Sequence, residues 1–242
     1  MNEWIKTLYE QGLSDGIYYA FHVFGFISCF ISAILVGKKL NVPVRKAVGL
    51  VLIVLPTLYA WMFFMFWAET GFRVFGGNNI VRVFVFLPLM GLLVAKVLKM
   101  HWKDSFHILA VAPLAIHGVA HFGCMFIGCC YGYINDWGLY HPGRQEIRFP
   151  IQPIEALAAW AIIAILWLRS KRKNYVSDGL ELPIMLMLFG FSRFFFEYLR
   201  DNDKYWYGIS NLAIHALLMG AVGLIMYAIM RIKMCRQVKN AA

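Results

Sequence analysis

The chain has 242 residues, of which 61% are hydrophobic and only 15% carry a charge. This composition excludes an ordinary soluble domain and predicts a single integral membrane domain, residues 1–242. The formal net charge of +10 does not indicate nucleic-acid binding, because the basic residues are grouped between apolar segments, where they orient a membrane protein.

The chain begins with a polar segment, Met1 to Ser14, which predicts a short amphipathic stretch on the outer surface and no cleavable signal peptide. Seven apolar stretches follow, and a helix needs roughly 20 apolar residues to cross the hydrocarbon core. The predicted spans are Gly16–Val36, Ala47–Ala68, Ile80–Leu98, Phe106–Cys129, Ile154–Leu168, Leu182–Leu199 and Leu212–Met230. We therefore expect an all-α polytopic membrane protein with seven transmembrane helices.

The basic residues predict the orientation of these spans. With seven spans, fifteen of the 23 Lys and Arg residues lie on one side of the membrane. They are Lys38, Lys39, Arg45, Lys46, Lys96, Lys99, Lys103, Arg169, Lys171, Arg172, Lys173, Arg231, Lys233, Arg236 and Lys239. The positive-inside rule assigns that side to the cytoplasm, with the N-terminus outside and the C-terminus cytoplasmic.

The fourth predicted span ends in a stretch rich in glycine, histidine and cysteine. Its glycines would let a neighbouring helix or a lipid approach the backbone closely; they are Gly118, Gly123, Gly128 and Gly132. His117 and His121 share a helix face with Cys124 one turn further on, a set that can bind a metal. We expect no metal, because no carboxylate flanks the set and thiols pack well in apolar surroundings. A disulfide between Cys124 and Cys129 is conceivable at this outer helix end, whereas adjacent Cys129 and Cys130 pair poorly.

The longest non-apolar stretch runs from Tyr131 to Gln152, and the topology places it outside. Gln152 and Glu155 then enter the fifth span one helical turn apart. Two interpretations stay open for this pair. Either the two side chains cap the start of a helix below a solvated loop, or they belong to a functional site.

The sixth predicted span carries charges where a lipid-facing helix should not. Spacings of four and three put Arg193, Glu197 and Arg200 on one helix face. Ionisable residues at bilayer depth are costly and normally face the bundle interior. This face is cationic and partly neutralised, which suits an anionic headgroup. Together with Gln152 and Glu155 it predicts one site in the outer half of the membrane.

Three sequence patterns in this order carry a family resemblance. They are Gly-x-x-x-x-Gly-x-x-x-Gly in Gly123–Gly132, Arg148-x-Pro150-x-Gln152-x-x-Glu155, and Arg193-x-x-x-Glu197-x-x-Arg200-x-x-Asp203. Across roughly the C-terminal half, the chain resembles the bacterial prolipoprotein diacylglyceryl transferases. That family's seven-span, N-out topology agrees with the hydropathy and charge pattern.

The resemblance implies a reaction and roles for particular residues. The family moves the diacylglyceryl group of phosphatidylglycerol onto the lipobox cysteine thiol of a prolipoprotein, in the bacterial cytoplasmic membrane and without a cofactor. Arg193 and Arg200 match the arginines of the family's sixth span, and a guanidinium fork suits phosphate. The expected catalytic residues are His121, Arg193 and Glu197. The expected substrate-binding residues are Tyr18, Cys124, Gly132, Arg148, Gln152, Glu155 and Arg200.

The chain also departs from the family pattern. The family's His-Gly-Gly aligns with Phe75-Gly76-Gly77, so phenylalanine replaces its histidine. His121 and Cys124 replace an arginine and an asparagine, and His22 stands roughly where a tyrosine is usual. His121 can act as a general base for a thiol, or it can be a satisfied intramembrane histidine. Arg82 would restore positive charge if the third span turned it inward.

Three functions therefore compete. The first is a diverged transferase that acts on a glycerophospholipid, with a prolipoprotein thiol or another acceptor at the outer face. The second is a catalytically silent phospholipid-binding membrane protein, which the loss of the family histidine favours. The third is a membrane thiol–disulfide protein that uses Cys124, Cys129 and Cys130. The intramembrane arginines favour the first two.

Overall fold

The computed structural model describes residues 3–69, 71, 81–142, 144–171, 175–201 and 209–241. Phe75-Gly76-Gly77 and Asp203, which the family patterns include, lie outside the described residues. The helices are α1 (Glu3–Glu10), α2 (Ser14–Lys39), α3 (Val44–Glu69), α4 (Val81–Phe84), α5 (Leu87–Val97), α6 (Trp102–Ile127), α7 (Ile151–Ser170), α8 (Glu181–Tyr198) and α9 (Asn211–Ala241). The strands are β1 (Ile134–His141) and β2 (Glu146–Arg148).

The helices identify a multi-pass membrane protein. Within the described residues, five helices are long and apolar enough to cross a membrane, and these are Ser14–Lys39, Val44–Ala68, Trp102–Ile127, Ile151–Ser170 and Asn211–Gln237. Helix α8 coincides with the sixth predicted span, but its 18 residues include three charged side chains. The number of seven spans and the orientation of the termini stay predictions.

The third predicted span, Ile80–Leu98, is not one continuous helix. The structure has the single-turn helix α4, a turn, and then α5 with only 11 residues. Pro88 lies in the first turn of α5, and its missing N–H cannot bond back to the preceding turn. The helix therefore restarts at Leu87. Eleven residues extend about 16 Å, which is too short to cross a bilayer alone.

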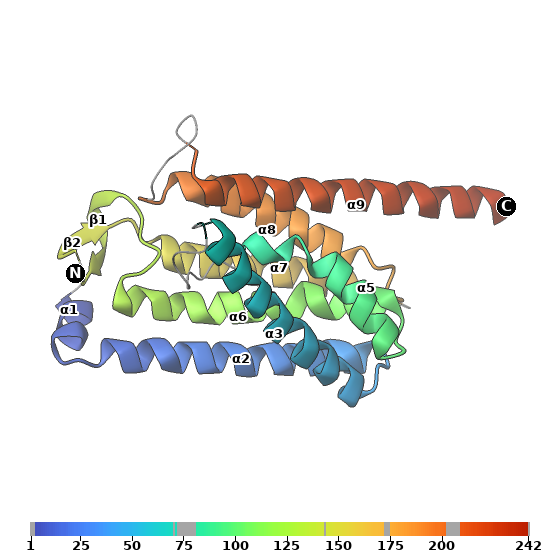
Figure 1. The fold of residues 1–242 in the computed structure, drawn as a ribbon, viewed down its shortest axis with the longest axis horizontal. Helices are drawn as coiled ribbons and strands as arrows, with labels where there is room; N and C mark the ends of the chain where they lie inside the picture. The colour runs from blue at the N-terminus through green and yellow to red at the C-terminus, as the bar shows by residue number, and fades with distance from the viewer. Residues whose placement is uncertain are drawn as a thin grey trace.

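Helix α6 is the centre of the bundle. Of the 18 residues in its most apolar stretch, 78% are buried, whereas the corresponding shares are 22% in α2 and 28% in α9. Figure 1 shows α2, α6, α7 and α9 running along the long axis of the molecule, with α3 inclined across them. The contact between α2 and α6 needs a glycine, because a Cβ at Gly123 would lie 2.8 Å from the Cβ of Phe21. The outer helices keep their apolar side chains exposed, as a lipid-facing surface requires.

The predicted loop after α6 folds into a small β-hairpin, so the part of the chain that the structure describes is all-α except for this segment. Strands β1 and β2 are antiparallel, with Tyr140 opposite Ile147. Before the hairpin, Gly132 pairs with Arg200 in an isolated bridge. A Cβ at Gly132 would lie 2.7 Å from the Phe149 carbonyl oxygen, so only glycine fits. This close approach ties the hairpin to the end of α8.

Helix α1 lies at the same end of the molecule as the hairpin (Figure 1). Its Ile5 side chain is fully buried, and the ring of Trp4 meets the ring of Phe126 edge-on at 5.7 Å. Lys6 and Glu10 are exposed on the other face. The polar first segment is therefore an amphipathic helix, as its sequence predicts, and it packs on the last turn of α6.

Candidate functional site

A single carboxylate joins two arginines between α7 and α8. The Oε1 atom of Glu155 accepts hydrogen bonds from Arg193 Nη1 at 2.5 Å and Arg200 Nε at 3.0 Å. Its Oε2 atom accepts from Arg200 Nη2 at 2.7 Å. Glu197 completes the set, with Oε2 3.2 Å from Arg193 Nη1. We call these four residues, Glu155, Arg193, Glu197 and Arg200, the cavity network.

The cavity network is buried and formally neutral. Its exposed fractions run from 1% for Glu155 to 6% for Arg200, and two guanidinium groups offset two carboxylates. Removing one partner from such a set leaves an uncompensated buried charge, which is strongly unfavourable.

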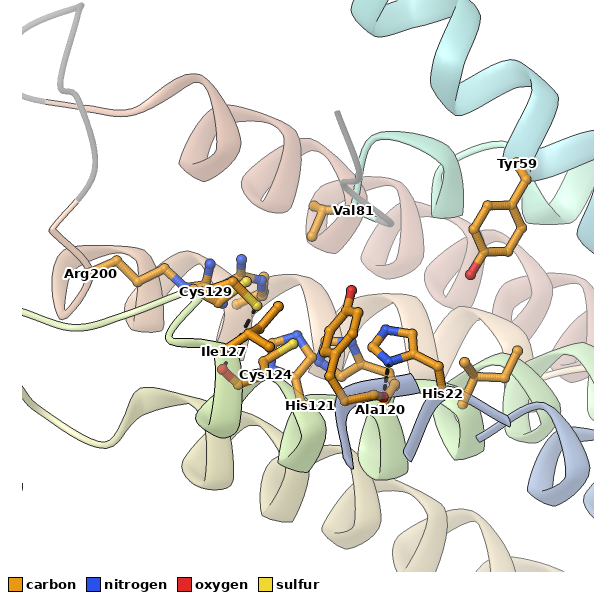
Figure 2. Close-up of a pocket in the computed structure, with 14 residues that line it drawn as sticks. His22, Tyr59, Val81, Ala120, His121, Cys124, Ile127, Cys129 and Arg200 are labelled. Atoms are coloured by element: carbon orange, nitrogen blue, oxygen red, sulfur yellow. Dashed lines mark hydrogen bonds between the residues drawn. The ribbon is translucent and has the colours of Figure 1, made fainter. Parts of the chain in front are cut away.

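The arginines of this network face a partly open cavity of about 240 Å³. The polar and sulfur-containing residues that line it are Tyr18, His22, Tyr59, His117, His121, Cys124, Cys129, Cys130, Arg193 and Arg200. Glu155 and Glu197 do not line it, so the carboxylates lie behind the guanidinium groups. In Figure 2, Arg200 and Cys129 lie at one end of the cavity and His22 and Tyr59 at the other. The wall therefore presents positive charge, which suits an anionic ligand.

His121 connects the cavity to the carboxylate. Its Nδ1 atom lies 3.3 Å from Glu155 Oε2, without the geometry of a hydrogen bond, and its ring centre is 4.0 Å from that of His117. The Nε2 atom of His117 is also buried without a hydrogen-bond partner among the described residues. Because Nδ1 of His121 makes no hydrogen bond to the described residues, the structure does not support the interpretation of a fully satisfied histidine. The position of His121 on the cavity wall suits proton transfer.

Two predicted residues hold the backbone around the cavity instead of lining it. Gln152 Nε2 donates to the Cys129 carbonyl oxygen at 2.9 Å. Arg148 Nη1 donates to the Gly132 carbonyl oxygen at 3.1 Å and to Asp201 Oδ2 at 2.7 Å. These two hydrogen bonds of Arg148 fix the segment between α6 and the hairpin against the end of α8. Gln152 does the same for the turn that follows α6.

Helices α2 and α3 contribute three side chains to the wall. Tyr18 and His22 come from α2, and His22 Nδ1 donates to the Tyr18 carbonyl oxygen at 2.9 Å. Tyr59 comes from α3, and no sequence pattern indicates its role, because a single tyrosine in an apolar span is common. Arg82 is not part of the wall. It is 9% exposed and lies over the ring of Phe66 at 5.6 Å.

All five cysteines are free thiols. The disulfide between Cys124 and Cys129 is therefore absent, although the Cys129 thiol lies 3.9 Å from the Cys124 carbonyl oxygen. Both residues line the cavity. The role of Cys124 in substrate binding stays a prediction.

These observations define a class: a multi-pass helical membrane protein with paired arginines on the wall of a buried cavity. Comparison with known proteins narrows that class. The family model for prolipoprotein diacylglyceryl transferase matches residues 46–230. The chain belongs to the prolipoprotein diacylglyceryl transferase family.

One curated relative is the phosphatidylglycerol–prolipoprotein diacylglyceryl transferase 2 of Clostridium perfringens (strain 13 / Type A). The chain is 24% identical to it over 179 residues, which cover 67% of this chain and 66% of the relative. The match thus spans just under two thirds of the relative's length.

Proposed function

We propose that this protein transfers the diacylglyceryl group of phosphatidylglycerol to a cysteine thiol of a prolipoprotein, in the cytoplasmic membrane of a bacterium. The observation that carries the proposal is the pair Arg193 and Arg200 on the cavity wall, with their carboxylates behind them. Membership of the family and the name of the Clostridium relative support the same reaction.

The reaction needs positive charge at the place where a phosphate group leaves. The acceptor sulfur forms a bond to the terminal glycerol carbon of the donor, and the bond from that carbon to the phosphate oxygen breaks. Glycerol phosphate departs with the electron pair. Arg193 and Arg200 would bind the phosphate and stabilise the charge that develops on the leaving oxygen. Because both side chains are already held by Glu155, little reorganisation is needed at that moment.

The thiol must also lose its proton. His121 lines the cavity and lies one helical turn from Cys124, next to the cavity network. A histidine is the usual general base for such a proton. We assign His121 this role. The Glu155 carboxylate, at 3.3 Å, would stabilise the positive charge of the protonated ring. Glu197 then acts on Arg193, which it contacts at 3.2 Å, as a positioning residue.

An apolar recess offers room for the acyl chains. It lies between α3 and α5, has a volume of about 500 Å³, and is lined by Thr57, Leu58, Ala60, Trp61, Phe64, Phe86, Leu89 and Met90. Tyr59, between two of these residues in the chain, lines the polar cavity. A donor with its phosphate at Arg193 and its acyl chains in this recess would bury apolar surface against apolar surface.

The test is transfer by purified protein in phospholipid nanodiscs, with labelled phosphatidylglycerol and a synthetic peptide that carries a lipobox cysteine. Mass spectrometry of the peptide should show the added diacylglyceryl group with the wild type and its loss with Arg193→Ala. Lys46→Ala is the control, because Lys46 lies on the surface and donates to the Lys99 carbonyl oxygen. Phosphatidylglycerol that binds at the arginines but is never turned over would identify the silent lipid-binding protein instead.

A further inference from the structure

Three cysteine thiols gather at the end of α6. The Sγ atoms of Cys124, Cys129 and Cys130 all lie within 4.8 Å of one another. The chain turns there through left-handed backbone at Gly128 (φ 67°) and again at Cys130 (φ 57°). A left-handed conformation is unfavourable for a side chain such as cysteine. The turn nevertheless brings Cys130 back beside the last turn of the helix.

The three thiols differ from an ordinary packed cysteine. Cys29 in α2 is fully buried in the hydrophobic core, where a thiol acts as a small apolar group. Cys129 and Cys130 are only partly buried, and with Cys124 they border the same cavity as Arg200 and His121. Three thiols on one polar wall are a ligand set rather than core packing.

We propose that Cys124, Cys129 and Cys130 bind a thiophilic metal ion, with Zn²⁺ as the best match, and leave its fourth coordination position open to the cavity. Zinc–sulfur bonds of about 2.3 Å place tetrahedral sulfur atoms about 3.8 Å apart. The present separations, all within 4.8 Å, need only small side-chain rotations to reach that value. Thiolate ligands also favour Zn²⁺ over harder cations such as Mg²⁺.

A second group with metal-ligating atoms, His117, His121 and Glu155, lies within the same 4.8 Å limit. It is the poorer site. Both oxygens of Glu155 already accept hydrogen bonds from Arg193 and Arg200. A dication there would sit against two guanidinium groups and lose most of the carboxylate's attraction. Three thiolates around Zn²⁺ instead leave one negative charge, which Arg200 on the same wall can attract.

The open position gives the metal a use, and this step rests on the proposed function. A thiol that binds Zn²⁺ gives up its proton, here to His121 on the same cavity wall, and is held as a thiolate. An acceptor cysteine bound at the fourth position would therefore be nucleophilic in a cavity whose arginines hold the phosphate. The metal site itself does not depend on this step.

The test is a Co²⁺ titration of the reduced, full-length protein in detergent. Co²⁺ bound to thiolates absorbs strongly in the near ultraviolet through sulfur-to-metal charge transfer. We expect this band to appear and saturate at one metal per chain, and Zn²⁺ to displace it. Cys124→Ser and Cys130→Ser should each abolish or strongly weaken it. Cys235→Ser is the matched control, since Cys235 is exposed near the end of α9, and it should leave the band unchanged.

Two results would overturn the proposal. One is that the wild type shows no charge-transfer band, although the wild type and all variants melt at the same temperature and are therefore folded. The other is metal uptake that survives in the triple serine variant but is lost in His117→Ala, which would assign the ion to the histidines. Alkylation of the denatured, chelator-treated protein without reductant should modify five cysteine thiols. Modification of only three thiols would indicate a disulfide. None of these readouts needs lipid or acceptor, so the metal site and the transfer reaction can fail separately.

Discussion

Two networks of arginine and carboxylate side chains link α7 and α8, one near each end of these helices. The cavity network joins Glu155 to Arg193 and Arg200. The loop network, which comprises Arg169, Tyr175, Asp178 and Glu181, joins the end of α7 to the start of α8. Arg169 donates to Asp178 and, at 2.9 Å, to Glu181, and the Tyr175 hydroxyl also donates to Glu181. Each network has a fully buried carboxylate at its centre.

The networks differ in what lies next to them. In the loop network one guanidinium meets two carboxylates, and none of the four residues lines the cavity of about 240 Å³. In the cavity network two guanidinium groups share Glu155 and both line that cavity. The loop network therefore fixes a helix connection, whereas the cavity network presents charge to the cavity. Intramembrane charge identifies a site only when it faces a space that a ligand can enter.

Glu155→Leu should have the largest effect. It leaves the Arg193 and Arg200 guanidinium groups buried against each other without their shared carboxylate. We expect a loss of about 3–5 kcal/mol in the free energy of unfolding, and no detectable transfer. Thermal unfolding in detergent and the peptide assay would measure both. A variant as stable and as active as the wild type would remove the cavity network from the account.

Arg200→Lys should separate charge from shape. Lysine keeps the positive charge but loses the fork that reaches both oxygens of Glu155 at 3.0 and 2.7 Å. We expect the turnover number for diacylglyceryl transfer to fall about tenfold to a hundredfold, the equivalent of one or two charged hydrogen bonds. Steady-state kinetics would show it. Unchanged kinetics would mean that only net charge matters at this wall.

Arg169→Met tests the other side of the comparison. It removes the hydrogen bonds to Asp178 and Glu181 and should lower the free energy of unfolding by about 2 kcal/mol. The folded fraction should transfer lipid with the wild-type Michaelis constant. Kinetics below the melting temperature, corrected for the folded fraction, would measure it. A raised Michaelis constant for phosphatidylglycerol would show that the loop network also acts on the site.

Gln152→Leu should have the smallest effect. It removes one hydrogen bond, to the Cys129 carbonyl oxygen at 2.9 Å, and leaves the arginines in place. We expect about 1 kcal/mol of lost stability and a change in transfer rate of less than tenfold. The same two assays apply, with Gln152→Glu as the variant of matched length. A complete loss of transfer would mean that Gln152 contacts the substrate directly.

The sequence predicted what depends on local spacing. The one-face spacing of Arg193, Glu197 and Arg200 and the apolar lengths of the long spans are properties of single helices. The break before α5 is also a local feature, because it depends on Pro88. The continuous apolar stretch around Pro88 nevertheless led to the prediction of a single span. These features needed no knowledge of how the helices pack.

The rest required the packing of segments far apart in the chain. Tyr59 reaches the cavity only because α3 crosses the bundle, and no local pattern distinguishes it. In the sequence, Arg169 counted only as a charge that orients the protein, yet it pairs with both carboxylates of the loop network. The proximity of Glu155 to both arginines likewise depends on how α7 meets α8. The sequence predicted that these charges form one site, but which side chains line the cavity depends on tertiary packing.

The most direct test of the central claim is complementation of a bacterial strain depleted of its diacylglyceryl transferase, read by mass spectrometry of a reporter lipoprotein. The account predicts a diacylglyceryl-modified cysteine when the wild-type chain is expressed and an unmodified cysteine with Arg193→Ala. Equal modification by both proteins would contradict the role of the cavity arginines. An unmodified reporter with wild-type protein present in the membrane would contradict the proposed reaction.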